Sequence, residues 1–231
     1  NEYGAQVWRG YTYAWNEEQT DAFLIESKGR DRTYEIRDAG VPGGIRQQTW
    51  HFPSRTECTL CHTMAARYVL GVNTRQMNRV YDYGRDIGQK NQIDYLNEIG
   101  LFTEPVSEPP EKLRRLADYH DPSVSTARRA RSYLDANCSH CHRKWGGGNA
   151  DFQLLATLPV EETGMINTRP GQGAFGLNTD PRLLVPGDPD RSLIFHRMQL
   201  LELGRMPHIG SSVRDEESIR FIRNWIQHLQ P

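Results

Sequence analysis

Two pentapeptides, CTLCH at residues 58–62 and CSHCH at residues 138–142, contain all four cysteines of this 231-residue chain. In both of them a histidine follows the second cysteine directly. Two thiols three positions apart lie on one side of a helical turn, so both can react with the edge of a single flat molecule. The next residue then presents its imidazole to the same molecule.

The pattern C-x-x-C-H is the attachment pattern of a c-type haem. Its two cysteines form thioethers with the two vinyl groups of one porphyrin, and its histidine binds the iron. The sequence therefore predicts two haem c groups. Cys58, Cys61 and His62 would hold the first, and Cys138, Cys141 and His142 would hold the second.

Zinc and disulfides are the alternative uses of four cysteines. Zinc ribbons place their two C-x-x-C pairs about 15–20 residues apart, and the gap between the pairs is far longer here. Neither zinc binding, a redox C-x-x-C nor a pair of disulfides requires a histidine after each pair. With only 8 histidines in the chain, the two that follow the pairs favour haem.

The overall composition excludes some partners and suggests a compartment. A formal charge of −1 argues against a nucleic-acid or anionic-membrane surface. Arginine greatly outnumbers lysine, and some arginines could pair with haem propionates.

We expect no transmembrane segment, because no apolar stretch is long enough. Haem c is attached outside the cytoplasm, which predicts a periplasmic or otherwise extracytoplasmic protein. Asn1 suggests a processed chain or an excised part of a longer one.

Residue patterns divide the chain into three parts. Residues 1–52 alternate aromatic and β-branched residues with turn signals, which predicts a small antiparallel sheet with its aromatics in the core. Residues 53–121 open with the capping box S-R-T-E at 54–57 and contain the first motif. Within them, Thr74 and Asn91 are predicted to cap two further helices. Residues 122–231 contain the second motif.

Two amphipathic helices are predicted to flank the second motif. One runs from Ser125 into Cys138 with an apolar stripe, and the other begins near Asp215 and buries a row of isoleucines. We expect these helices to pack together, as in a class I cytochrome c domain. The predicted fold is thus mainly α with an N-terminal antiparallel β region and two haem c units, the C-terminal one a class I cytochrome c fold.

The second axial ligand decides whether a haem iron only carries electrons or also binds a substrate. For the second haem we predict Met206, in the stretch RMPHIG between the last two helices. Pro207 stiffens the loop that presents the thioether. Met198 is the alternative, but its place within an apolar helical stripe already explains it.

The first haem has several candidate ligands. Met77, on the helix after the motif, is the first choice, and His120 follows because it lies about as far beyond His62 as Met206 lies beyond His142. Met64 and His51 are further candidates, and the position can also be open. His140, inside the second motif, is interpreted as a variable residue that points away from the iron.

Several stretches of the chain resemble a bacterial family of diheme c-type cytochromes, which occur alone or appended to larger secreted proteins such as PQQ-dependent sugar dehydrogenases. The stretches are YTYAWNEEQTDAFL (11–24), WHFPSRTECTLCH (50–62), TRQMNR (74–79), NQIDYLNEIGLF (91–102), RARSYLDANCSHCHRKWGG (129–147), LVPGDPDRSLIFHRM (184–198), RMPHIG (205–210) and NWIQHL (224–229). Together they cover nearly the whole chain. The resemblance implies a redox partner protein or a fused dehydrogenase domain.

The leading functional hypothesis is an exported diheme cytochrome c, or the cytochrome domain of a larger redox enzyme. It would transfer electrons from a dehydrogenase-type donor to a downstream acceptor and would have no catalytic residue of its own. The alternative is a diheme peroxidase-like enzyme in which the first haem is open and a nearby acid–base residue, a Glu or a His, assists. Glu57 is adjacent to Cys58, but its role in the capping box is the simpler account of it.

Overall fold

A computed structural model describes residues 7–230 of the chain. The α-helices are α1 (Arg55–Cys61), α2 (Thr74–Met77), α3 (Gln92–Glu98), α4 (Thr126–Cys138), α5 (Leu193–Met198) and α6 (Glu216–His228). The strands are β1 (Tyr13–Trp15), β2 (Ala22–Leu24), β3 (Arg30–Arg37), β4 (Ile45–Phe52), β5 (Val80–Asp82) and β6 (Gln89–Asn91). Two short 3-10 helices, η1 (Val160–Thr163) and η2 (Pro189–Arg191), interrupt the long connection between α4 and α5.

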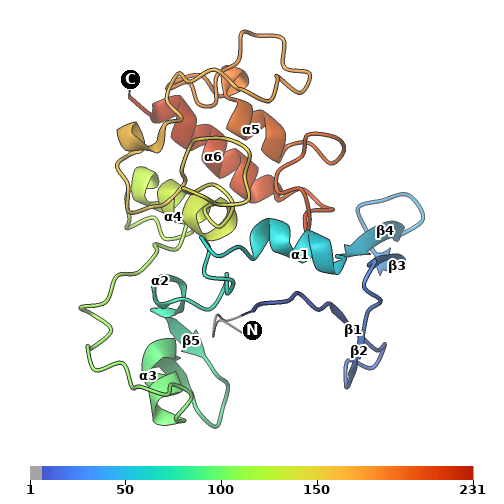
Figure 1. Cartoon of the computed structure of the whole chain (residues 1–231), viewed down its shortest axis with the longest axis vertical. Coiled ribbons are helices and arrows are strands. Elements are labelled where there is room, and N and C mark those ends of the chain that lie inside the picture. The colour runs from blue at the N-terminus through green and yellow to red at the C-terminus, as the bar shows by residue number, and fades with distance from the viewer. Residues whose placement is uncertain (1–6, 231) are drawn as a thin grey trace.

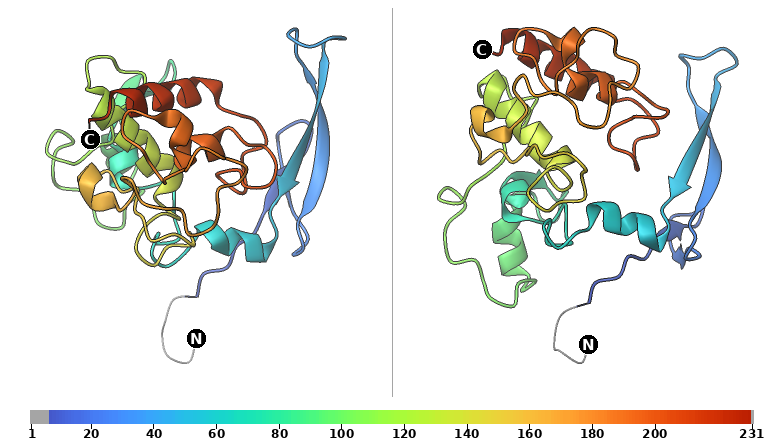
Figure 2. Two further views of the ribbon diagram at one scale, coloured as in Figure 1. Left: turned by 90° about the horizontal axis from the view of Figure 1, so that it is seen from above. Right: turned by 45° about the horizontal axis from the view of Figure 1, so that its top comes forward.

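The N-terminal strands form two separate antiparallel pairs, β1 with β2 and β3 with β4. The β3–β4 hairpin stands away from the helical body as an arm (Figure 2). A small cluster of Ala14, Ile25 and Phe52 is buried at its base, against Tyr34. Tyr13 and Trp15 are 58% and 62% exposed. The prediction that they belong to the core is wrong, because strand alternation turns only Ala14 inward.

Helix α1 joins this β region to the rest of the molecule (Figure 1). The predicted capping box is confirmed: the Ser54 hydroxyl accepts from the Glu57 amide, and the Glu57 carboxylate accepts from the Ser54 amide. These two bonds satisfy backbone donors that the first turn of a helix leaves unpaired. They fix the start of the helix that carries the first cysteine pair.

Residues 73–99 form a small lobe of α2, the β5–β6 pair and α3. Asn91 caps α3 as predicted, with its side chain accepting from the Ile93 amide. The cap of α2 is Asn73 and not the predicted Thr74. Asn78 is buried behind α2, where its amide donates to the carbonyl oxygens of Pro110 and Leu113 and thereby ties down the connector that follows.

The main hydrophobic core lies in the C-terminal part, where α4 packs against α6 as predicted. Ala130 and Leu134 of α4 meet Ile222 and Ile226 of α6, and all four are completely buried. Further core residues come from the connection after the second motif and from α5: Phe152, Leu154, Met165, Leu184 and Phe195. The second motif therefore extends directly from a helix of the main hydrophobic core.

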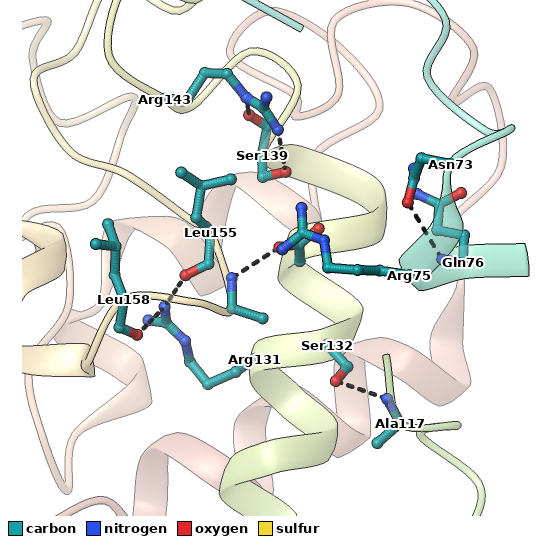
Figure 3. Close-up of polar contacts among 12 residues, drawn as sticks. Asn73, Arg75, Gln76, Ala117, Arg131, Ser132, Ser139, Arg143, Leu155 and Leu158 are labelled. Carbon is teal, nitrogen blue, oxygen red and sulfur yellow. Dashed lines mark hydrogen bonds and ion pairs between the residues drawn. The ribbon is translucent and has the colours of Figure 1, made fainter. Parts of the chain in front are cut away.

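Polar contacts fasten the α2 lobe to α4 (Figure 3). Arg75 Nη1 lies 2.9 Å from Asp135 Oδ2, and Asp135 is only 4% exposed. The same carboxylate oxygen accepts from the Ala156 amide, and the Ser132 hydroxyl accepts from the Ala117 amide. The contacts of Arg75 with Asp135 and of Ala117 with Ser132 cross the predicted domain boundary at residue 121, and that boundary stays a prediction.

The predicted fold class is wrong. The six α-helices have between 4 and 13 residues, and long irregular connections separate them, so residues 7–230 are not mainly helical. Antiparallel pairing also recurs outside the N-terminal region, in β5–β6. The two motifs do not form two separate units either. Within residues 7–230, one group of Cys and His side chains has metal-binding geometry, and it consists of Cys61, His140 and Cys141. This group takes residues from both motifs. Sequence periodicity could not reveal this contact between distant segments.

None of the helices within residues 7–230 has both the length and the apolar character needed to cross a bilayer.

Candidate functional site

Each motif lies at the C-terminal end of a capped helix. Helix α1 ends at Cys61, and the amide of His62 donates to the Cys58 carbonyl oxygen at 3.0 Å. Helix α4 ends at Cys138, and the amide of His142 donates to the Cys138 carbonyl oxygen at 2.9 Å. Both histidines are thus held one turn beyond the first cysteine of their motif, on the side to which the cysteines point.

The two motifs touch one another. The Sγ atoms of Cys61 and Cys141 and a ring nitrogen of His140 lie within 4.8 Å of each other. The Cys141 thiol donates to the carbonyl oxygen of Leu60, with a donor–acceptor distance of 3.4 Å. Arg143 adds a second link, because its guanidinium donates to the Ala65 carbonyl oxygen at 3.0 Å. The C-terminal end of α1 is therefore seated against the loop of the second motif.

The environment of the thiols differs between the members of each pair. Hydrogen bonding from Cys141, and next from His140, lowers the pKa of Cys61 to about 4. The interaction with Cys61, and next burial, raises the pKa of Cys141. Burial raises the pKa of Cys138 to about 12. A thiolate is the reactive form of cysteine, and the lowered pKa favours this form at Cys61.

His62 lies exposed on the surface, but its ring is oriented. Its Nδ1 is in contact with the carbonyl oxygen of Tyr68. A carbonyl can only accept, so Nδ1 carries the proton and Nε2 keeps a free lone pair. Tyr68 is itself held by stacking on Trp8, with ring centroids 5.0 Å apart. A hydrogen bond from one ring nitrogen is the usual way in which a metal-binding histidine is oriented.

His142 lies instead against the core. Its ring stacks on Phe152 at 4.3 Å between centroids, and burial lowers the pKa of the imidazole to about 4. The ring is therefore neutral at physiological pH, which is the form that binds a metal. Its Nδ1 is buried without a hydrogen-bond partner in the described part of the chain. A buried nitrogen without a partner costs free energy in the folded chain.

Two neighbouring cavities, of about 270 and 280 Å³, open beside His142. Met206 lines both of them, as do several apolar residues and one arginine: Cys138, Phe152, Leu183, Leu193, Arg197 and Pro207. The amide of Met206 donates to the Arg197 carbonyl oxygen at 3.1 Å, which anchors the Met206 loop on α5. The predicted pair His142 and Met206 is thus brought to one mostly apolar space.

The arginine of this space lacks the usual partner of a buried cation. The Nε of Arg197 donates to the Gly204 carbonyl oxygen at 2.6 Å, and its guanidinium lies 3.9 Å from the centre of the Phe175 ring. Burial alone lowers its pKa, with no nearby carboxylate to raise it. A carboxylate group bound in the cavities would provide the missing opposite charge.

The candidate axial ligands for the first haem are not brought to His62 in the way that Met206 is brought to the space beside His142. His51 has both ring nitrogens engaged, Nδ1 with Asp31 at 2.6 Å and Nε2 with Glu57 at 3.0 Å. His120 pairs its Nδ1 with Glu217 at 3.1 Å, on the side of α6. Met64 is 77% exposed, and Met77 ends α2. Within residues 7–230, no hydrogen bond or ion pair joins any of these side chains to His62, so the choice among them stays a prediction.

The contact between the motifs is what sequence reasoning missed. The sequence predicts that His140 is a variable residue pointing away from the iron, whereas a nitrogen of its ring lies within 4.8 Å of the Sγ atoms of both second cysteines. The three glycines at 146–148 are the signal that could have indicated it, because a glycine run after a motif permits close approach of another backbone. In the folded chain, a Cβ atom at Gly147 would lie 2.0 Å from the Leu60 carbonyl oxygen.

Comparisons of this chain with protein-family models, with curated proteins and with solved structures found no match.

Proposed function

We propose that this chain is an exported electron-transfer protein, or the electron-transfer domain of a larger redox enzyme, that carries two covalently attached haem c groups. The observation that carries the proposal is the second site. There a C-x-x-C-H motif, a neutral buried histidine and a methionine line the same apolar space. Haem iron changes between its ferric and ferrous states and so transfers one electron at a time.

The residues of the chain would hold these groups in different ways. Cys138 and Cys141 would form the thioethers at the second site, with His142 and Met206 as the axial ligands. Arg197 would pair with a propionate, because it is the arginine that lines both cavities. At the first site Cys58 and Cys61 would form the thioethers, and His62 is already oriented with Nε2 free.

The function follows from this choice of ligands. Ligation by methionine raises the reduction potential of a haem, so the second site would be where electrons leave toward the acceptor. The first site, which lies on the surface, would receive them from a dehydrogenase-type donor. Attachment of haem c outside the cytoplasm makes a periplasmic location part of the proposal.

Quantitation of haem tests the proposal directly. The full chain is produced in a host that attaches haem c, and the pyridine haemochrome is measured per chain. Two haems are expected, and fewer than two would contradict the proposal. Met206→Ala should remove the weak red absorption band of methionine-ligated ferric haem from one of the two haems. Met198→Ala, in the same region, is the control and should leave that band unchanged.

A second candidate function is a peroxidase-like enzyme with an open first iron. The observation that favours it is that the ring of His62 is exposed. Glu57, paired with His51 beside Cys58, would then be the acid–base group. A high-spin ferric signal from one haem, together with turnover of peroxide, would support this candidate. Two low-spin haems would exclude it.

A further inference from the structure

We propose that the two attachment sites form one contiguous redox centre, in which Cys61 and Cys141 are the point of contact and Gly147 is the positioning residue that permits it. The inference deepens the proposed function and rests on it. Its starting point is that the second cysteine of each motif, and not the first, lies at the contact. Each porphyrin would therefore be held, through the second cysteine of its motif, at this contact.

The contact does not depend on the free thiols. Thioether formation consumes both S–H groups and would remove the bond from Cys141 to Leu60. The link between Arg143 and the Ala65 carbonyl oxygen would remain, because it involves neither cysteine. Arg143 is itself fixed by donating from Nε to the Ser139 carbonyl oxygen at 2.6 Å. The two backbones are thus joined independently of the sulfur atoms.

Gly147 sets how closely the two segments approach. A Cβ atom built there would lie 2.0 Å from the Leu60 oxygen and 3.1 Å from its carbonyl carbon. Both are backbone atoms in the last turn of α1, so they cannot move without moving Cys61. Any side chain at position 147 would therefore push the two motifs apart. The neighbouring Gly146 is crowded only by its own motif, at the Cys141 carbonyl and Arg143.

Contact between the attachment sites has a functional consequence. Electron transfer between two groups slows steeply with their separation, so two porphyrins held at this contact allow rapid exchange between the two irons. An electron received at the exposed first site would then pass directly to the second. The pair would act as one unit toward its partners.

The test is the circular dichroism of the Soret band in the haem-loaded full chain. Two porphyrins in contact couple their transitions and give a band of two opposite signs, and this coupling falls steeply with distance. We expect such a band in the unchanged chain. It should be absent from the summed spectra of two single-haem variants, Cys58→Ala/Cys61→Ala and Cys138→Ala/Cys141→Ala. If the Soret spectrum of the chain without substitutions equals the sum of the two single-haem spectra, the proposal is overturned.

Gly147→Ala tests the positioning residue. This variant should keep two haems per chain but lose most of the amplitude of the two-signed band. Gly71→Ala is the matched control, because a Cβ there meets nothing within 4 Å. It should leave the band unchanged. Full amplitude in Gly147→Ala would refute the role of Gly147.

A further variant covers the case in which Gly147→Ala does not mature. Arg143→Gln removes the link to Ala65 without adding bulk, and it too should weaken the two-signed band. The number of haems per chain, measured as the pyridine haemochrome in every sample, separates the proposed function from the proposal of a contiguous redox centre. Fewer than two haems in the unchanged chain would contradict the proposed function, whereas two haems without coupling would contradict only the contiguous centre.

Discussion

The two C-x-x-C-H motifs occupy contrasting environments. The second one extends from α4, and its histidine is buried against Phe152 beside cavities that Met206 also lines. The first one ends a seven-residue helix with no buried residue, and its histidine is exposed. The contrast teaches that the same five residues provide attachment chemistry at both places, whereas the surrounding packing determines how each bound group would be shielded and tuned.

The largest expected effect comes from removing one attachment site at a time. Cys138→Ala/Cys141→Ala should lose one haem and empty the apolar space beside the core. Emptying a large buried site costs about 3–5 kcal/mol. At about 2–4 °C per kcal/mol for a chain of this size, Tm should fall by on the order of 10 °C. The measurement is thermal unfolding followed by far-ultraviolet circular dichroism.

The matching variant at the first motif sharpens the comparison. Cys58→Ala/Cys61→Ala should also lose one haem, but with a clearly smaller fall in Tm, because His62 and its surroundings are exposed. Equal losses of Tm from the two double variants would show that the two environments do not differ energetically, and the comparison would fail.

The axial ligands provide the next test. Met206→Ala should lower the potential of one haem by on the order of 100 mV, within the range of about 0.8 V that axial ligands span. A redox titration followed in the visible spectrum measures it. Met77→Ala is the counterpart at the first site, and an equal shift of the other haem would identify Met77 as its ligand. No shift would leave the first site to His120, Met64, His51 or an open position.

The link between the two regions can be broken without touching either motif. Arg75→Met should destabilise the chain by on the order of 3 kcal/mol, because it leaves the buried Asp135 carboxylate without its cation. Arg79→Met is the control. Arg79 lies 3.7 Å from Asp118 and both side chains are largely exposed, so its loss should cost less than about 1 kcal/mol. Chemical denaturation of both variants decides between these values.

The smallest effect is a pH dependence at the first region. Hydrogen bonds from His51 and Ser54 lower the pKa of Glu57 from 4.5 to about 2, and those to Glu57 and Asp31 raise the pKa of His51 above 6.5. The lowered pKa of Glu57 contributes stability above pH 4.5, which is lost as the pH falls toward 2. The raised pKa of His51 contributes stability below pH 6.5, which is lost as the pH rises through its raised value.

Both contributions are therefore complete only between about pH 4.5 and 6.5. A nuclear magnetic resonance titration of His51 should give a midpoint above 6.5, and Glu57→Gln should move that midpoint downward. The amide oxygen of the introduced glutamine can still accept from the Ser54 amide, so the helix cap is retained in this variant. An unchanged midpoint would mean that Glu57 does not pair with His51 in solution.

Local structure followed well from local sequence. The box S-R-T-E predicted the start of α1, Asn91 predicted the cap of α3, and the apolar stripes predicted the packing of α4 on α6. These signals operate over one or two turns, so the residues that cause them are close together in the chain. The mainly α fold class failed because the long connections carry no periodic signal.

The sequence by itself determined the chemistry that this chain offers: four cysteines in two pairs, a histidine after each, and a methionine in a proline-containing loop. Only the tertiary structure decided where these groups lie. It buried His142, left His62 exposed, and brought Cys61 to Cys141 across 80 residues of chain through the close approach that Gly147 allows. The reason is physical: attachment needs only neighbours within one turn, whereas burial and contact between distant segments depend on packing that no single segment encodes.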